Sequence, residues 1–184
     1  LLAGALPASD GTAASSSQVC GRALASLVAH DDADEVRALA RGGLADERLY
    51  VLPTSDFTAI TAAAFCLSTT GATSEAIEAL DRVIGAAHQI GQLSTVATVS
   101  ASRAGALLAA GRVSEAADSA ELALGAAHAW PIERPSAAAA LAEVHRLHGD
   151  LDRAIRTLAE HPTRSDGGPL RTAELQWLVV AARV

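Results

Sequence analysis

The sequence predicts an all-α protein, a superhelical stack of antiparallel helix pairs. Residues 111–128 repeat residues 71–88 after forty positions, with eight of the eighteen residues identical, and periods of this size are typical of helical hairpin arrays. Half of the residues are hydrophobic, yet aromatic residues make up 3% and Met is absent. The core must therefore consist mainly of Ala, Leu, Val and Ile, and small residues let helices pack closely. No segment has the alternating pattern of a strand.

Apolar residues at helical spacing predict the helices in chain order. Gly42 and Gly43 are expected to end the second helix, residues 44–54 to form a loop, and Thr54 or Ser55 to cap the third helix. Pro131 and Pro135 mark one longer break. The expected helices cover residues 15–30, 32–41, 55–67, 74–90, 93–110, 114–129, 136–148, 152–161 and 170–183.

Three glycines stand at the repeated turns. Gly71, Gly111 and Gly149 are forty and then thirty-eight residues apart. Each is expected to adopt the left-handed conformation that ends one helix and leads into its partner. Small residues on the first inward turn of each second helix let the two helices of a pair approach closely, and these are Ala76, Ala116 and Ala154.

These residues resemble the tetratricopeptide repeat over roughly residues 57–161. The small residue expected on the first helix of each pair falls at Ala64, Ala104 and Ala142. The large apolar residue expected on the second helix is Leu80 or Leu158 in two copies, but Ala120 in the middle one. The aromatic positions hold Ile60, Ser100 and Ala138, so the repeats are degenerate.

A narrower resemblance lies in the run EVRALAR, SEAIEALDRVIGAAHQIG, SRAGALLAAGRVSEAADSAELALGAAHAWP and AAALAEVHRLHGDLDRAIRTL. This run is similar to the helical-repeat region of LuxR-type (MalT-like) large ATP-binding transcriptional regulators. The resemblance implies a sensor region that binds a small inducer or a regulatory protein and contacts other domains of its parent chain. A generic tetratricopeptide-like scaffold that joins proteins, with no transcriptional role, is the alternative.

The domain organisation expected is a single helical-repeat domain over residues 18–184, with residues 1–17 as a linker or the end of a preceding domain. The chain lacks an initiator Met and closes on an apolar helix, so we expect a fragment of a longer protein. No apolar run reaches the roughly eighteen residues of a membrane span. A cytoplasmic protein is expected, with Cys20 and Cys66 as buried free thiols.

The charge pattern argues against nucleic-acid contact by this chain. The net charge is −7, all fourteen basic residues are Arg, and most stand beside Asp or Glu. Without a GxxxxGK[ST] loop or a GxSxG elbow, we expect no cofactor and no enzymatic activity. A metal site at His145 and His148, near Glu143, is the weaker alternative to a polar helix end.

The candidate binding surface is the concave side, which the first helices of successive pairs line in repeats of this type. It is mildly polar and suits a small ligand or an apolar helix, although many of its positions could instead pack against neighbouring helices. The register exposes Thr58, Thr61, Phe65, Ser68, Thr98, Ala101, Gly105, Leu108, Ser136, Ala139, Glu143 and Arg146. The candidate contact residues among them are Thr61, Phe65, Ser68, Thr98, Leu108, Glu143 and Arg146.

Overall fold

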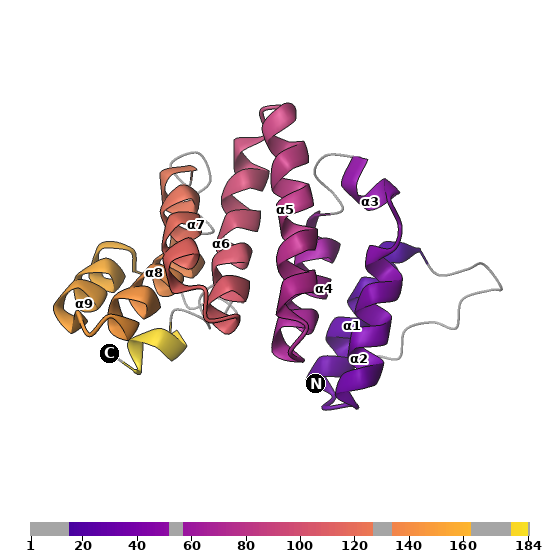
Figure 1. Ribbon diagram of the computed structural model, residues 1–184, viewed down its shortest axis with the longest axis horizontal. Helices are drawn as coiled ribbons and strands as arrows, with labels where there is room; N and C mark the ends of the chain where they lie inside the picture. The colour runs from indigo at the N-terminus through magenta and orange to yellow at the C-terminus, as the bar shows by residue number, and fades with distance from the viewer. Residues whose placement is uncertain (1–14, 52–56, 127–133, 163–177, 184) are drawn as a thin grey trace.

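The computed structural model describes residues 15–51, 57–126, 134–162 and 178–183, and this part of the chain is helical without any strand. The helices stand side by side in chain order, from the α1 and α2 end to the α9 end (Figure 1). The prediction of an all-α fold is confirmed. The helices are α1 (Ser16–Val28), α2 (Ala33–Leu44), α3 (Arg48–Val51), α4 (Phe57–Thr69), α5 (Thr73–Gln89), α6 (Leu93–Ala109), α7 (Val113–Ala126), α8 (Arg134–Leu147) and α9 (Leu151–Glu160).

The helices form two rows. The first-helix row consists of α1, α4, α6 and α8, each of which contacts the next member of the row. The second-helix row consists of α2, α5, α7 and α9, each packed on the first helix of its own pair. Within the described residues no contact of similar extent joins α2 to α5, α5 to α7 or α7 to α9. The first helices of successive pairs therefore contact one another more extensively than the second helices do.

The helical turns use residues in the left-handed conformation. Gly71, Gly111 and Gly149 have φ angles of 91°, 74° and 80°, as expected. Gly91, which the sequence reading did not single out, has a φ of 70° and joins α5 to α6. His30, at 64°, takes the equivalent place between α1 and α2, so this irregular pair is closed by the same turn as the others.

One hydrogen-bond pattern recurs at all five turns. The N–H of the residue after the left-handed one donates to the carbonyl five residues earlier, at 2.8 to 3.1 Å. The left-handed residue itself donates to the carbonyl three residues earlier. This pair of bonds satisfies carbonyls that a helix end would otherwise leave open. The turn is therefore a repeated structural unit, not a flexible connection.

Small side chains fill the contacts between helices, as the repeat register predicts. Ala64 on α4 is 1% exposed, and the other alanines of the register are fully buried. The degenerate aromatic positions are also fully buried, so an aliphatic or small residue serves there as core. These fully buried residues are Ala76, Ala104, Ala116, Ala142 and Ala154, with Ile60, Ser100 and Ala138 at the aromatic positions.

The expectation that Gly42 and Gly43 end the second helix is wrong, because α2 continues to Leu44. Gly43 packs directly against α1, where a Cβ would lie 2.4 Å from the Sγ of Cys20 and 3.2 Å from the carbonyl oxygen of Ser16. The missing side chain permits a close helix contact here, and the glycine does not serve as a stop signal.

The expected loop over residues 44–54 contains the short helix α3. The Asp46 carboxylate, just before it, accepts hydrogen bonds from the Arg48 N–H at 3.0 Å and from the Ser16 hydroxyl at 2.6 Å. The Arg48 guanidinium and the Ser16 hydroxyl hold the pKa of Asp46 below its ordinary value. The expected cap at Thr54 or Ser55 lies outside the described residues.

Helix α8 begins at Arg134, before Pro135, so the break expected at Pro131 and Pro135 ends earlier than predicted. Pro135 is buried in the first turn of α8, where the missing N–H of proline removes no helical hydrogen bond. Pro131, the last residues of the helix expected at 114–129, and most of the helix expected at 170–183 lie outside the described residues. Residues 178–181 form a helical turn.

Cys20 and Cys66 are buried free thiols, as predicted. Burial raises the pKa of each thiol to about 11, which keeps both protonated. In the described part of the chain, no helix is both long enough and apolar enough to span a membrane.

Replacing Gly111 by Ala should lower the free energy of unfolding by about 1 kcal/mol, because an L side chain is disfavoured at positive φ. Chemical denaturation measures the change. Gly85→Ala is the control, since this helical glycine has open space around a Cβ and the substitution should stabilise by about 0.5 to 1 kcal/mol. Equal destabilisation by both substitutions would contradict the left-handed assignment.

Replacing Ala116 by Phe should destabilise the protein by about 1 to 3 kcal/mol, because the side chain would be forced into a filled contact between helices. Thermal and chemical unfolding measure the loss. The control is Ala38→Phe on the exposed side of α2, which should change stability by no more than about 0.5 kcal/mol. A harmless Ala116→Phe would show that the repeat register is wrong.

Candidate functional site

The predicted surface positions on the first-helix row divide into accessible and buried groups. Ala101, Ser136 and Ala139 are buried, so these three do not form a binding surface. Ala101 packs against Ala123 and Ala137, because the alanine-rich α8 lies close to α6 and α7. The residues that stay at least partly accessible are Thr58, Thr61, Phe65, Ser68, Thr98, Gly105, Leu108, Glu143 and Arg146.

Phe65 is the largest apolar side chain of this surface. It projects from α4 and is 43% exposed, whereas its neighbours Ala64 and Cys66 are in the core. A Phe side chain that remains open beside a fully packed helix face is an available contact for a partner. The prediction that Phe65 lies on the surface of α4, and not between helices, agrees with this placement.

Two threonine hydroxyl groups near Phe65 donate to the backbone of their own helix, whereas the buried Ser68 hydroxyl has no hydrogen-bond partner among the described residues. The Thr61 hydroxyl donates to the Thr58 carbonyl at 2.9 Å, and the Thr69 hydroxyl donates to the Phe65 carbonyl at 2.8 Å. On α6, the Ser102 hydroxyl donates to a carbonyl four residues earlier at 3.3 Å. A threonine bonded in this way leaves its methyl group as the free part of the side chain. The surface is therefore more apolar than its composition indicates.

The charged end of the candidate surface is internally paired. Arg146 donates two hydrogen bonds of 2.8 Å to the Glu143 carboxylate, and Arg183 lies 3.6 Å from the same carboxylate. The Glu143 side chain is 13% exposed. The hydrogen bonds from Arg146 hold the pKa of Glu143 below its ordinary value. Glu143 is consequently paired with Arg146 and lies near Arg183, so it offers a partner little free charge.

The histidines and carboxylates do not assemble into a metal centre in the described residues, where no group of three or more His, Cys, Asp and Glu side chains could hold an ion. Burial lowers the pKa of His145, with the nearby Arg153 charge acting in the same direction. The absence of a cofactor and of enzymatic activity stay predictions.

The sequence reading missed a pocket in the second-helix row. It lies between α2 and α5 beside the short helix α3, and its lining includes Tyr50 of α3 and Arg82 of α5. The Arg82 guanidinium stacks on the Tyr50 ring, 3.6 Å from its centroid. The only tyrosine of the chain, within the charged stretch DERLY, was the available signal. The expectation of a loop over these residues left it without a partner.

Comparison with known proteins identifies the fold. No protein-family model matches the chain, and no curated protein matches it in sequence. In structure the chain is similar to a Podosopora anserina protein described as a kinesin light chain with nearly identical TPR-like repeats. The TM-score is 0.58 and the identity 18%, over 91% of this chain and 82% of that chain. The expected tetratricopeptide-like repeat fold is thereby confirmed.

Acidification should weaken the fold partly through Glu143. Its pKa is lowered in the folded state, so its stabilising effect is present above the unfolded pKa of about 4.3 and is lost as the pH falls through the folded pKa. In Glu143→Gln, the loss of unfolding free energy between about pH 5 and pH 3 should be smaller than in the parent. An unchanged slope in Glu143→Gln would contradict this contribution.

Proposed function

We propose that this chain is a helical-repeat scaffold that binds a protein partner on its first-helix row. The partner segment would be an apolar helix, held along the accessible faces of α4 and α6. The proposal rests on one observation, the exposed Phe65 beside Thr61 and Thr69, whose hydroxyl groups are bonded to their own backbone. The tetratricopeptide-like fold supports it, because such stacks present extended curved surfaces to partners.

The charge distribution supports an apolar partner. Helix α4 contains no charged residue, and the single charged residue of α6, Arg103, is paired with Asp81 of α5. A charged peptide would lose hydration on this surface and gain no opposite charge in return. An apolar helix has no charged group to desolvate, and it would bury the Phe65 ring as a central anchor.

The narrower proposal is that the scaffold is the sensor segment of a LuxR-type ATP-dependent regulator, where partner or inducer binding would act on modules elsewhere in the parent chain. It is supported by the resemblance of the repeated segments and not by the fold alone. Reading the parent gene tests it. A P-loop module upstream and a helix-turn-helix module downstream are expected, and the regulator assignment fails if both are missing.

Peptides selected from a helical-peptide library against the chain should depend on Phe65. Phe65→Ala should weaken their binding by about tenfold or more, which corresponds to the loss of a hot-spot side chain, and leave helicity unchanged in circular dichroism. Leu122→Ala on α7 is the matched control, because Leu122 is also 43% exposed but belongs to the second-helix row. Peptides that lose affinity only with Leu122→Ala would refute the proposed surface.

A further inference from the structure

The pocket between α2 and α5 has an apolar floor and a polar rim. Its volume is about 220 Å³. Leu67 of α4 and Ala79 of α5 are buried beneath it, and Leu44 and Ala45 at the end of α2 form one wall. Pockets for whole small-molecule ligands usually measure about 300 to 1,000 Å³, so this one is the size for a single side chain.

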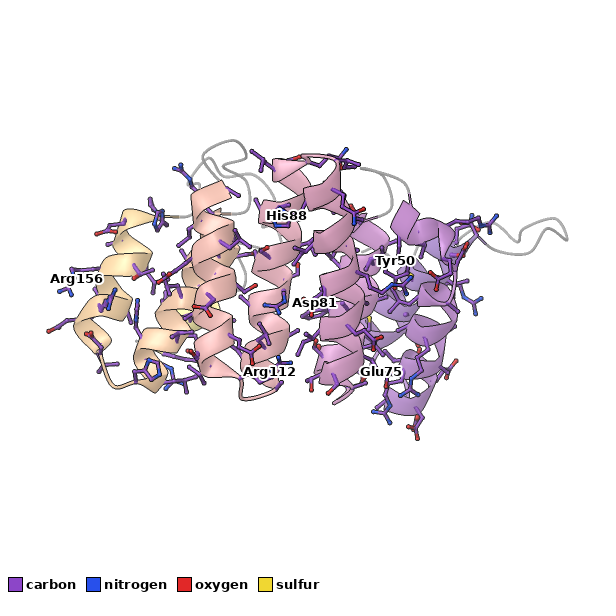
Figure 2. The ribbon with its side chains drawn as sticks, turned by 45° about the horizontal axis from the view of Figure 1, so that its top comes forward. Tyr50, Glu75, Asp81, His88, Arg112 and Arg156 are labelled. Atoms are coloured by element: carbon purple, nitrogen blue, oxygen red, sulfur yellow. The ribbon has the colours of Figure 1, made fainter. Side chains whose placement is uncertain are left out.

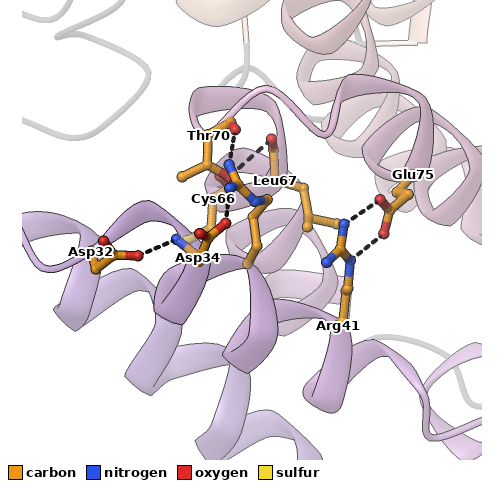
Figure 3. A network of polar contacts seen from close by, with 8 residues as sticks. Asp32, Asp34, Arg41, Cys66, Leu67, Thr70 and Glu75 are labelled. Atoms are coloured by element: carbon orange, nitrogen blue, oxygen red, sulfur yellow. Dashed lines mark hydrogen bonds and ion pairs between the residues drawn. The ribbon is translucent and has the colours of Figure 1, made fainter.

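The two arginines on the rim are already engaged. Arg41 donates two hydrogen bonds of 2.7 Å to the Glu75 carboxylate, which joins α2 to α5 (Figure 3). Arg82 forms an ion pair with Glu47 and covers one face of the Tyr50 ring. Tyr50 lies beside α5, and Glu75 is nearer the beginning of that helix (Figure 2). An anionic ligand would therefore have to displace an existing pair.

Among the described residues, Glu78 is the rim carboxylate without a partner. It stands on α5 one turn after Glu75 and one turn before Arg82, is exposed, and makes no hydrogen bond or ion pair with the described residues. Burial raises the pKa of Tyr50, and the nearby charges of Glu47 and Glu78 add to this effect, while Arg82 opposes it. The lining holds two carboxylates and two guanidinium groups, but both guanidinium groups are paired, Arg82 with Glu47 from outside the lining. The whole chain carries a net charge of −7.

We propose that this pocket binds a basic side chain, Lys or Arg, of a partner protein. The methylene stem would lie on Leu67 and Ala79, and the cationic head would pair with the free Glu78 carboxylate. The long aliphatic stem with a charged end matches an apolar floor beside an unpaired charge. This site is on the second-helix row and does not depend on the surface around Phe65.

The test uses Nα-acetyl-lysine methylamide as the probe and its Nε-acetylated form as the neutral control, with the ¹⁵N-labelled 184-residue chain observed by NMR. Titration should shift the amides of residues 44, 45, 50, 67, 78, 79 and 82. The neutral probe should bind about threefold to fivefold more weakly, as expected for a partly exposed ion pair. Ala45→Leu, which places a larger side chain in the pocket wall, should abolish the shifts from both probes.

Charge-removing variants identify the carboxylate. Glu78→Gln should weaken binding of the lysine probe about threefold to fivefold and make its affinity equal to that of the neutral probe. Glu121→Gln, an equally isosteric change at an exposed carboxylate on α7, should leave binding unchanged. Shifts scattered over the surface, equal affinity of the two probes for the parent chain, or equal losses in the two variants would each overturn the proposal.

Discussion

The contact between small side chains at each helix crossing is the constraint on which the rest of this structure depends. Ala64 and Ala76, one on each helix of a pair, have almost no exposed surface, and the same positions are alanines in the following two pairs. With so little side-chain volume between the backbones, the helices approach closely and most of their stabilisation comes from packing over their length. Gly43 extends the same rule to the first pair, where no Cβ fits at all.

The turns between closely packed helices share one backbone geometry. Five turns of the described residues join packed helices through one residue in the left-handed conformation and the same two hydrogen bonds. His30 shows that the geometry is imposed by the packed helices, because a residue with a Cβ adopts the conformation that glycine adopts elsewhere. The turn sequence contributes to this arrangement without being its sole cause.

The two rows present different chemistry to solvent. On the first-helix row, α4 and α6 carry almost no charge, and Thr61 and Thr69 bond to their own backbone. The helices of the second-helix row carry more charged residues than those of the first. Arg41 with Glu75 joins α2 to α5, and Arg82 of α5 pairs with Glu47 in the turn before α3. Each bridge lies at an exposed position and contributes little stability by itself. The wider spacing between α2 and α5 also leaves room for the pocket beside Glu78.

The all-α class, the turn glycines and the buried alanine register could be predicted from the sequence alone. A forty-residue repeat and a 3.6-residue apolar period are visible in the order of the residues themselves. Phe65 could likewise be placed on the surface of α4 from its position in the repeat. Other features depended on neighbours distant in the chain. Gly43 became a helix contact because Cys20 lies opposite it, and Ala101 and Ala139 became core because the alanine-rich α8 packs closely on its neighbours. The pairing of Tyr50 with Arg82, thirty-two residues later, likewise arose only when α3 came to lie against α5. Packing between helices is a long-range property, so tertiary structure alone decided which small residues are buried and which charges remain unpaired.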